Sequence, residues 1–238
     1  MTPQGAMIAV ELSADQERLA KEVSSAVAAG AGIVVLRGDD RSPWQAAIGE
    51  LRRSGLTIAV DASNVISADV FSARPDIACL PFSDTDLAER NLYIHRTLAE
   101  MVEFCELAMS ANIGAGGIVA NSGAAWTLDH LWGRGLLADP VFVELPFAVP
   151  GGQWAPASFD ALTYRLGLLS AVCIPFVSVA GIDAVSAKEL LTLALAIGAH
   201  VVVPAARVEW ACELASALGR VPARRWPPPR LDGASANA

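Results

Sequence analysis

Short apolar runs rich in β-branched residues alternate with longer helical segments along this chain, and this alternation restricts the fold more than any other feature. The predicted strands are residues 7–12, 32–37, 56–62, 76–82, 114–120, 141–149, 176–182 and 200–203. Strands that alternate with helices form a parallel sheet, because each helix carries the chain back across the sheet. Eight right-handed units of this kind close on themselves, so we predict an α/β fold, a single (βα)8 TIM barrel.

Local signals predict where several helices begin and end. Ser13, with Gln16 three residues later, has the pattern of a capping box, which predicts a helix directly after the first strand. Pro43 is predicted at the first position of the next helix, and Gly55 just beyond its end. Residues 86–111 are predicted to form one long helix.

The length of 238 residues suits one barrel domain, which typically needs about 250. We assign residues 1–221 to the TIM barrel domain and residues 222–238 to a Pro-rich, partly disordered C-terminal tail. Three consecutive prolines, Pro227 to Pro229, are followed there by small and polar residues. The four cysteines are widely spaced, so we interpret them as small buried hydrophobes; they are Cys79, Cys105, Cys173 and Cys212.

The acidic balance of the chain excludes several kinds of partner. The formal net charge is −8, and the only basic cluster, formed by Arg224, Arg225 and Arg230, lies in the tail. We therefore expect no nucleic acid and no anionic lipid as partners. No apolar run approaches the roughly 18 residues that cross a membrane, and the N-terminus lacks the pattern of a signal peptide. We expect a cytoplasmic homo-oligomer without membrane contact.

Several segments match the motifs of a known family in order. They are Ala28-Ala29-Gly30-Ala31-Gly32-Ile33-Val34-Val35-Leu36-Arg37, Ser122-Gly123, Gly135-Leu136-Leu137 with Pro140, Val149-Pro150-Gly151-Gly152, Val179-Ala180-Gly181-Ile182, Gly198-Ala199-His200-Val201 and Leu218-Gly219-Arg220. Together they resemble the β-keto acid cleavage enzymes, most closely over residues 112–220. The resemblance implies the same barrel, and an enzyme that condenses a β-keto acid with acetyl-CoA to give acetoacetate and a new CoA thioester.

The resemblance also implies a zinc ion, but the ligands that the family uses are missing. The His-x-His pair on the second strand is replaced by Val35 and Arg37, and the Glu that follows the eighth strand by Ala206. The supporting Arg of the eighth strand is Val202, and the Glu of the fifth strand is Ile118. We therefore expect no metal and no other cofactor.

Other family positions also differ in this chain. The Asp beside the zinc-binding Glu is replaced by Arg207, and the Arg after the seventh strand by Ala184. The hydroxyls that contact the substrate on strands three and four fall at Asp61 and Cys79. The long loops that follow the first and eighth strands in the family are short here. The loss of these loops fits the loss of the ligands, because both loops border the metal site.

Active sites of this fold lie at the carboxyl ends of the strands, so the polar residues there are the candidates. The candidates for catalysis are Asp61, Arg37, Arg207, Glu11 and Glu144. The candidates for substrate binding are Arg37, Asp61, Pro150, Gly151 and Gly152. The glycines of the turn Pro150-Gly151-Gly152 allow the backbone to approach an anionic or planar ligand, although such a turn also occurs as an ordinary strand-to-helix connection.

Arg37 and Arg207 are predicted near the space where the family holds its metal, and two interpretations remain open. The two guanidinium groups either hold a carboxylate ligand, as zinc would, or pair with acidic side chains and fill the space. The acidic partners would be Asp61 first, then Glu11 or Glu144. The three histidines, His95, His130 and His200, are predicted in structural or surface positions.

Three functional hypotheses follow from these observations. The first is a metal-independent enzyme with carbon-carbon lyase or acyltransferase-like activity, acting on or binding a small β-keto or related carboxylate, including a CoA-linked one. The second is a non-catalytic barrel, a pseudoenzyme, that binds a ligand or a partner protein. A zinc-dependent lyase with different ligands is least favoured, because the sequence offers no cluster of His or Cys.

Overall fold

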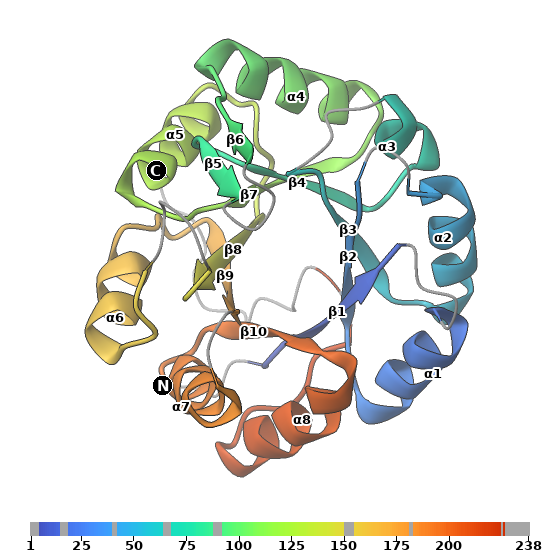
Figure 1. The fold of residues 1–238 in the computed structure, drawn as a ribbon, viewed down its shortest axis with the longest axis vertical. Coiled ribbons are helices and arrows are strands. Elements are labelled where there is room, and N and C mark those ends of the chain that lie inside the picture. The colour runs from blue at the N-terminus through green and yellow to red at the C-terminus, as the bar shows by residue number, and fades with distance from the viewer. Residues whose placement is uncertain are drawn as a thin grey trace, which may run out of the picture.

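The computed structural model describes residues 5–14, 19–39, 42–63, 68–87, 92–149, 155–180, 183–224 and 226. Eight parallel strands close into a barrel in the order β1-β10-β9-β8-β7-β4-β3-β2, with the helices outside (Figure 1). The strands are β1 (Ile8–Ser13), β2 (Ile33–Arg37), β3 (Thr57–Asp61), β4 (Ile77–Pro81), β7 (Gly114–Ile118), β8 (Val141–Phe147), β9 (Cys173–Val179) and β10 (His200–Pro204). The prediction of a single TIM barrel is confirmed.

The helices cover the outer face of the barrel, where they bury the outward-pointing residues of the strands. They are α1 (Leu19–Ala29), α2 (Trp44–Leu51), α3 (Ala68–Ala73), α4 (Leu98–Ser110), α5 (Ser122–Gly133), α6 (Phe159–Gly167), α7 (Ala184–Ala196) and α8 (Val208–Ala217). No helix in the described part of the chain has the length and apolar character needed to cross a membrane.

Inside the barrel, the inward-pointing residues form a second apolar core, because side chains alternate between the two faces of a strand. Its buried members are Met7, Ala9, Ile33, Val35, Ala59, Ile77, Cys79, Ile118, Phe142, Phe176 and Val202. All four cysteines are free and buried, as predicted. The barrel interior is therefore packed with side chains along most of its length.

The segment after α8 closes the amino-terminal end of the barrel. The Ala223 amide donates to the Ala6 carbonyl at 2.7 Å, and the Ala6 amide donates to the Val221 carbonyl at 2.9 Å. The Trp226 ring lies 5.8 Å from the Phe142 ring and 6.0 Å from the Phe176 ring, measured between centroids. The start of the predicted tail thus packs against the barrel, while residues 227–238 lie outside the described part.

A substitution at Gly32 tests this closure. A Cβ at Gly32 would overlap the Ala223 carbonyl oxygen and lie 3.2 Å from the Arg224 Cα, and backbone atoms cannot move aside as a flexible side chain can. We expect Gly32→Ala to lower the free energy of unfolding by about 1–3 kcal/mol in urea titrations. Gly49→Ala is the matched control, because its Cβ would meet nothing within 4 Å in helix α2 and should leave stability equal or slightly higher. Equal stability of the Gly32 variant and the wild type would contradict the tight closure.

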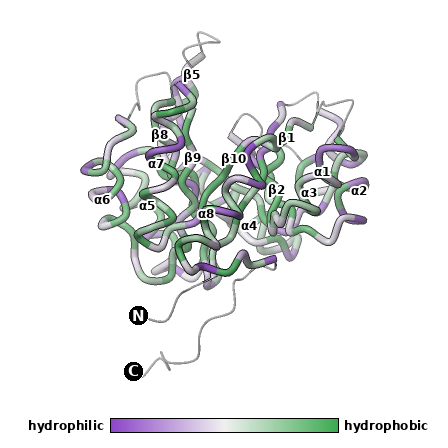
Figure 2. The backbone as a smooth tube through the Cα atoms, turned by 90° about the horizontal axis from the view of Figure 1, so that it is seen from below, coloured by the Kyte–Doolittle hydropathy of each residue, from purple (hydrophilic) through white to green (hydrophobic). Residues whose placement is uncertain are grey.

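The largest difference from the sequence prediction falls on residues 86–111. The prediction that they form one long helix was wrong. A hairpin of β5 (Thr85–Leu87) and β6 (Leu92–Ile94) precedes helix α4, and the β5 strand projects from one end of the barrel (Figure 2). Thr97 caps α4 through a capping box with Glu100, so the helix begins only at Leu98.

The predictions for two helix starts have different outcomes. Ser13 is the last residue of β1 and pairs with Arg37 in the sheet. Gln16, its predicted capping partner, lies outside the described residues, so the capping box stays a prediction. Pro43 is the N-cap of α2, so its prediction at the first helical position was wrong by one residue. Gly55 does follow the end of this region with φ 74°, as predicted.

Candidate functional site

A cluster of five polar side chains lies inside the carboxyl-terminal half of the barrel, and we call it the mouth cluster. Its members are Glu11 on β1, Arg37 on β2, Asp61 on β3, Glu144 on β8 and Ser178 on β9. Each lies two residues after a member of the inner apolar core, namely Ala9, Val35, Ala59, Phe142 and Phe176. The two-residue period of the strands therefore turns all five inward, above the apolar core.

Arg37 lies at the centre of the mouth cluster, and each of its three guanidinium nitrogens contacts a different carboxylate. Its Nε lies 3.0 Å from Glu11 Oε1, its Nη1 pairs with Asp61 Oδ2, and its Nη2 donates to Glu144 Oε1 at 2.6 Å. Burial lowers the pKa of Arg37, but the charges of Glu144, Asp61 and Glu11 outweigh it and raise the pKa well above its ordinary value. Three carboxylates against one guanidinium give the cluster a formal charge of −2 when all are ionised.

Glu144 is the most enclosed acid of the cluster, with 1 % of its surface exposed. Its Oε1 accepts hydrogen bonds from Arg37 Nη2 and from Ser178 Oγ, both at 2.6 Å, while Oε2 is buried without a partner. Burial raises the pKa of Glu144, and the negative charges of Asp61 and Glu11 add to it, against the lowering effects of Arg37 and Ser178. The arrangement suits a neutral carboxyl group whose Oε1 accepts and whose Oε2 carries the proton.

Asp61 connects the cluster to the loop that follows β3. Its Oδ1 accepts hydrogen bonds from the Ser63 amide at 2.8 Å and from the Ser63 hydroxyl. The Ser63 carbonyl oxygen in turn accepts a hydrogen bond from Arg96 Nη2. A continuous polar chain thus runs from Arg37 through Asp61 and Ser63 to Arg96.

The structure brings four of the five catalytic candidates together and leaves one apart. Arg37, Asp61, Glu11 and Glu144 form the mouth cluster. Arg207 lies half-buried in the short 3-10 helix Ala205–Arg207, and within the described residues its side chain forms no ion pair or hydrogen bond. The expected pairing of Arg207 with an acidic side chain of the cluster is therefore not seen in the described residues.

The predicted binding turn, Pro150, Gly151 and Gly152, lies outside the described residues. Sequence reasoning also missed two residues that the structure places at the cluster. Ser178 carried a usable signal, because it is a lone hydroxyl two residues after Phe176 in an apolar strand. Arg96 carried none, since it fell within the residues predicted as one long helix.

The residues present do not fit the zinc ion that the family resemblance implies. Of the ligand positions, Val35 and Ala206 carry no donor, and Arg37 places a positive charge among the carboxylates that would attract a cation. No group of three or more His, Cys, Asp or Glu in the described part of the chain is arranged to hold a metal ion.

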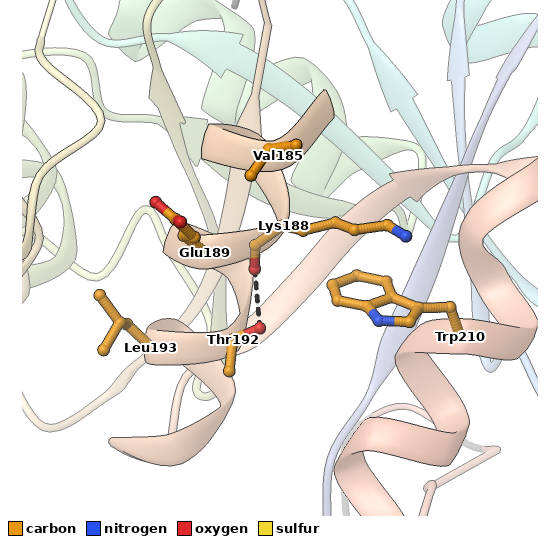
Figure 3. Close-up of a pocket in the computed structure, with 6 residues that line it drawn as sticks. All are labelled: Val185, Lys188, Glu189, Thr192, Leu193 and Trp210. Atoms are coloured by element: carbon orange, nitrogen blue, oxygen red, sulfur yellow. Dashed lines mark hydrogen bonds between the residues drawn. The ribbon is translucent and has the colours of Figure 1, made fainter. Parts of the chain in front are cut away.

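A separate groove of about 560 Å³ lies on the outer helical layer, between α7 and α8 (Figure 3). Its lining residues are Val185, Lys188, Glu189, Thr192, Leu193 and Trp210. The Lys188 ammonium lies 5.4 Å from the centre of the Trp210 ring. Nothing in this lining combines a buried acid or base with a polar partner, so the mouth cluster is the better candidate for chemistry.

Comparisons with known proteins agree with the fold. The family model described as beta-keto acid cleavage enzyme matches residues 12–203. No curated protein sequence matches the chain at a significant level. Among solved structures, dihydropteroate synthase from Yersinia pestis is 13 % identical, covers 90 % of this chain and 92 % of its own, and has a TM-score of 0.64.

Two further solved structures share the same architecture. The 3-dehydroquinate dehydratase from Aquifex aeolicus is 14 % identical, with a TM-score of 0.54, and covers 89 % of this chain and 98 % of its own. A truncated 3-deoxy-D-arabino-heptulosonate 7-phosphate synthase from Thermotoga maritima is 16 % identical, with a TM-score of 0.59, and covers 91 % and 88 %. At these identities the likeness shows the fold alone.

Proposed function

Because the chain belongs to the beta-keto acid cleavage enzyme family, we propose that it acts, without a metal ion, on a small β-keto or related carboxylate held at the mouth of the barrel. The proposal includes CoA-linked substrates, since the family reaction transfers an acyl group to CoA. The observation that carries it is the state of Glu144, a buried carboxyl group with one oxygen held by two donors and the other oxygen free.

A neutral Glu144 supplies the function that a metal would otherwise supply at a ketone. The Oε2–H group gives its proton to the ketone oxygen of the substrate as negative charge develops there on cleavage of the adjacent carbon–carbon bond, and Arg37 stabilises the Glu144 carboxylate that remains. Arg37 and Ser178 fix the orientation of the carboxyl group through Oε1. Burial favours the protonated form, which is the form that this role needs.

The substitution Glu144→Gln tests this role. We expect at least about a 100-fold loss of kcat, because the amide keeps the shape of the side chain but cannot transfer a proton. The assay incubates the protein, in the presence of EDTA, with acetyl-CoA and a panel of short β-keto acids, and detects new CoA thioesters by mass spectrometry. The wild-type rate should fall as the pH rises, because ionisation of Glu144 removes the donated proton.

Glu189→Gln is the matched control, because Glu189 is exposed on the outer groove and should leave the rate unchanged. Full activity of the Glu144 variant would show that another group performs the proton transfer. Wild-type activity that is present without EDTA but absent in the EDTA assay would contradict the metal-independent reaction.

A second candidate, the non-catalytic barrel, is favoured by one observation. Arg37 is surrounded by three carboxylates of the protein itself, which satisfies its charge without any ligand. Under this alternative, no β-keto acid in the panel is converted, with or without added zinc.

A further inference from the structure

Arg96 is held rigidly beside the carboxyl-terminal end of the barrel. It follows strand β6 and precedes Thr97, the N-cap of helix α4. Its backbone amide donates to Asp84 Oδ1 at 2.8 Å, and Asp84 Oδ2 accepts from the Tyr93 hydroxyl at 2.7 Å. Asp84 therefore fixes the base of the β5–β6 hairpin and, with it, the position of Arg96.

The guanidinium of Arg96 is buried but poorly satisfied. The residue is 8 % exposed, and of its five N–H donors only one, on Nη2, has a partner in the described residues, the Ser63 carbonyl oxygen. Nε is buried without a partner, and no carboxylate of the described chain lies within ion-pair distance. A buried cation in this state is unfavourable unless an anion completes its surroundings.

The other two buried arginines away from the mouth cluster form more contacts in the described residues than Arg96 does. The Nε of Arg165 also lacks a partner, but both of its terminal nitrogens donate, to the carbonyls of Pro146 and Val119, and its guanidinium stacks on the Phe147 ring at 4.4 Å. Arg220 donates to several backbone carbonyls, those of Leu195, Ala199, Gly198 and Gly5. Both tie segments of the fold together, whereas the single bond of Arg96 leaves most of its donors available.

The position of Arg96 places these donors next to the mouth cluster. Ser63, the partner of Arg96 among the described residues, binds Asp61, and Asp61 is close enough to Arg96 for its charge to act on it. Arg37 cannot receive a further anion, because each edge of its guanidinium already meets a carboxylate. The recognition of an anion that the sequence predicted at Arg37 is thus possible at Arg96 instead.

We propose that Arg96 binds the anionic group, a carboxylate or a phosphate, of the small molecule that enters the barrel mouth. This inference deepens the proposed function, since it names the residue that would hold the acid group of the substrate while Glu144 meets its ketone. A guanidinium with free donors on adjacent nitrogens is well suited to planar carboxylates and to phosphates.

Calorimetric titration with malonate, acetoacetate and inorganic phosphate tests the assignment. We expect the wild type to bind at least one of these probes, and Arg96→Gln to bind it at least about tenfold more weakly. Arg96→Lys should retain part of the affinity, because it keeps the charge without the fork of donors. Preference for malonate and acetoacetate would identify a carboxylate site, and preference for phosphate a phosphate site.

Arg53→Gln is the matched control, since it removes the same charge from an exposed position in the 3-10 helix Arg52–Ser54 and should leave affinity unchanged. Circular dichroism and thermal unfolding establish that the Arg96 variants fold, and Arg96→Lys keeps the test decisive if Arg96→Gln does not. Unchanged affinity in the folded variants, or no binding of any probe to the wild type, overturns the proposal. Binding that depends on Arg96 without any turnover would instead refute the proposed enzymatic function alone.

Discussion

Replacement of Arg37 by methionine is expected to lower the free energy of unfolding by roughly 3–5 kcal/mol at neutral pH. Among the described residues, Arg37 is the cation that pairs with Glu11, Asp61 and Glu144, and its removal leaves the charges of Asp61 and Glu11 uncompensated beside the buried Glu144. Urea unfolding followed by circular dichroism measures the effect. The loss should shrink as the pH falls, because protonation of the remaining carboxylates removes the negative charge that Arg37 compensates.

Two variants show whether this loss arises from unpaired charge. Arg53→Met makes the same substitution at an exposed position and should change stability by no more than about 0.5 kcal/mol. The double variant Arg37→Met with Glu144→Met removes the buried acid together with its partner and should recover part of the lost stability. If Arg37→Met alone is as stable as the wild type at neutral pH, the ion pairs do not hold the cluster together.

The strand–helix order was predictable because the strands of this fold are buried on both faces. Their apolar runs stand out from the helical segments, and eight of them in one chain leave few alternatives to a closed barrel. The β5–β6 hairpin was not predictable in the same way. It is short, projects from the barrel, and depends on side-chain bonds from Asp84 to Tyr93 and to the Arg96 amide, which no periodicity in the sequence reports.

The candidate site was predictable only where strands are neighbours. Arg37 and Asp61 end adjacent strands and pair in register, so their contact follows from the strand order. Glu144 stands on β8, which β1, β10 and β9 separate from β2, and it reaches Arg37 only across the interior of the closed barrel. Predicting that Glu144 lies inside the barrel, and hence that its pKa is raised, would have required the register of β8. That register places Glu144 opposite Phe176.

The opposite end of the barrel carries a buried histidine that should make the fold sensitive to acid. His200 Nδ1 accepts a hydrogen bond from the Met7 amide at 3.0 Å, and its ring packs 5.1 Å from that of Phe176. Burial, reinforced by the charge of Arg220, lowers the pKa of His200 to about 3. The native state therefore holds His200 neutral at pH values where the unfolded chain takes up a proton.

Acidification should consequently destabilise the wild type more than the variant His200→Asn. The folded pKa lies below the unfolded value of about 6.5, so the stability linked to His200 is fully present above that pH and is lost as the pH falls toward 3. The loss approaches about 1.4 kcal/mol per pH unit, up to roughly 5 kcal/mol in total. Asparagine can still accept a hydrogen bond from the Met7 amide but does not titrate. In urea unfolding between pH 7 and pH 4, the free energy of unfolding of His200→Asn should therefore fall less steeply with pH than that of the wild type.

His130→Asn, on helix α5, is the control that removes a histidine elsewhere. Parallel pH dependences for the wild type and the His200 variant would mean that His200 does not govern the acid stability of the barrel.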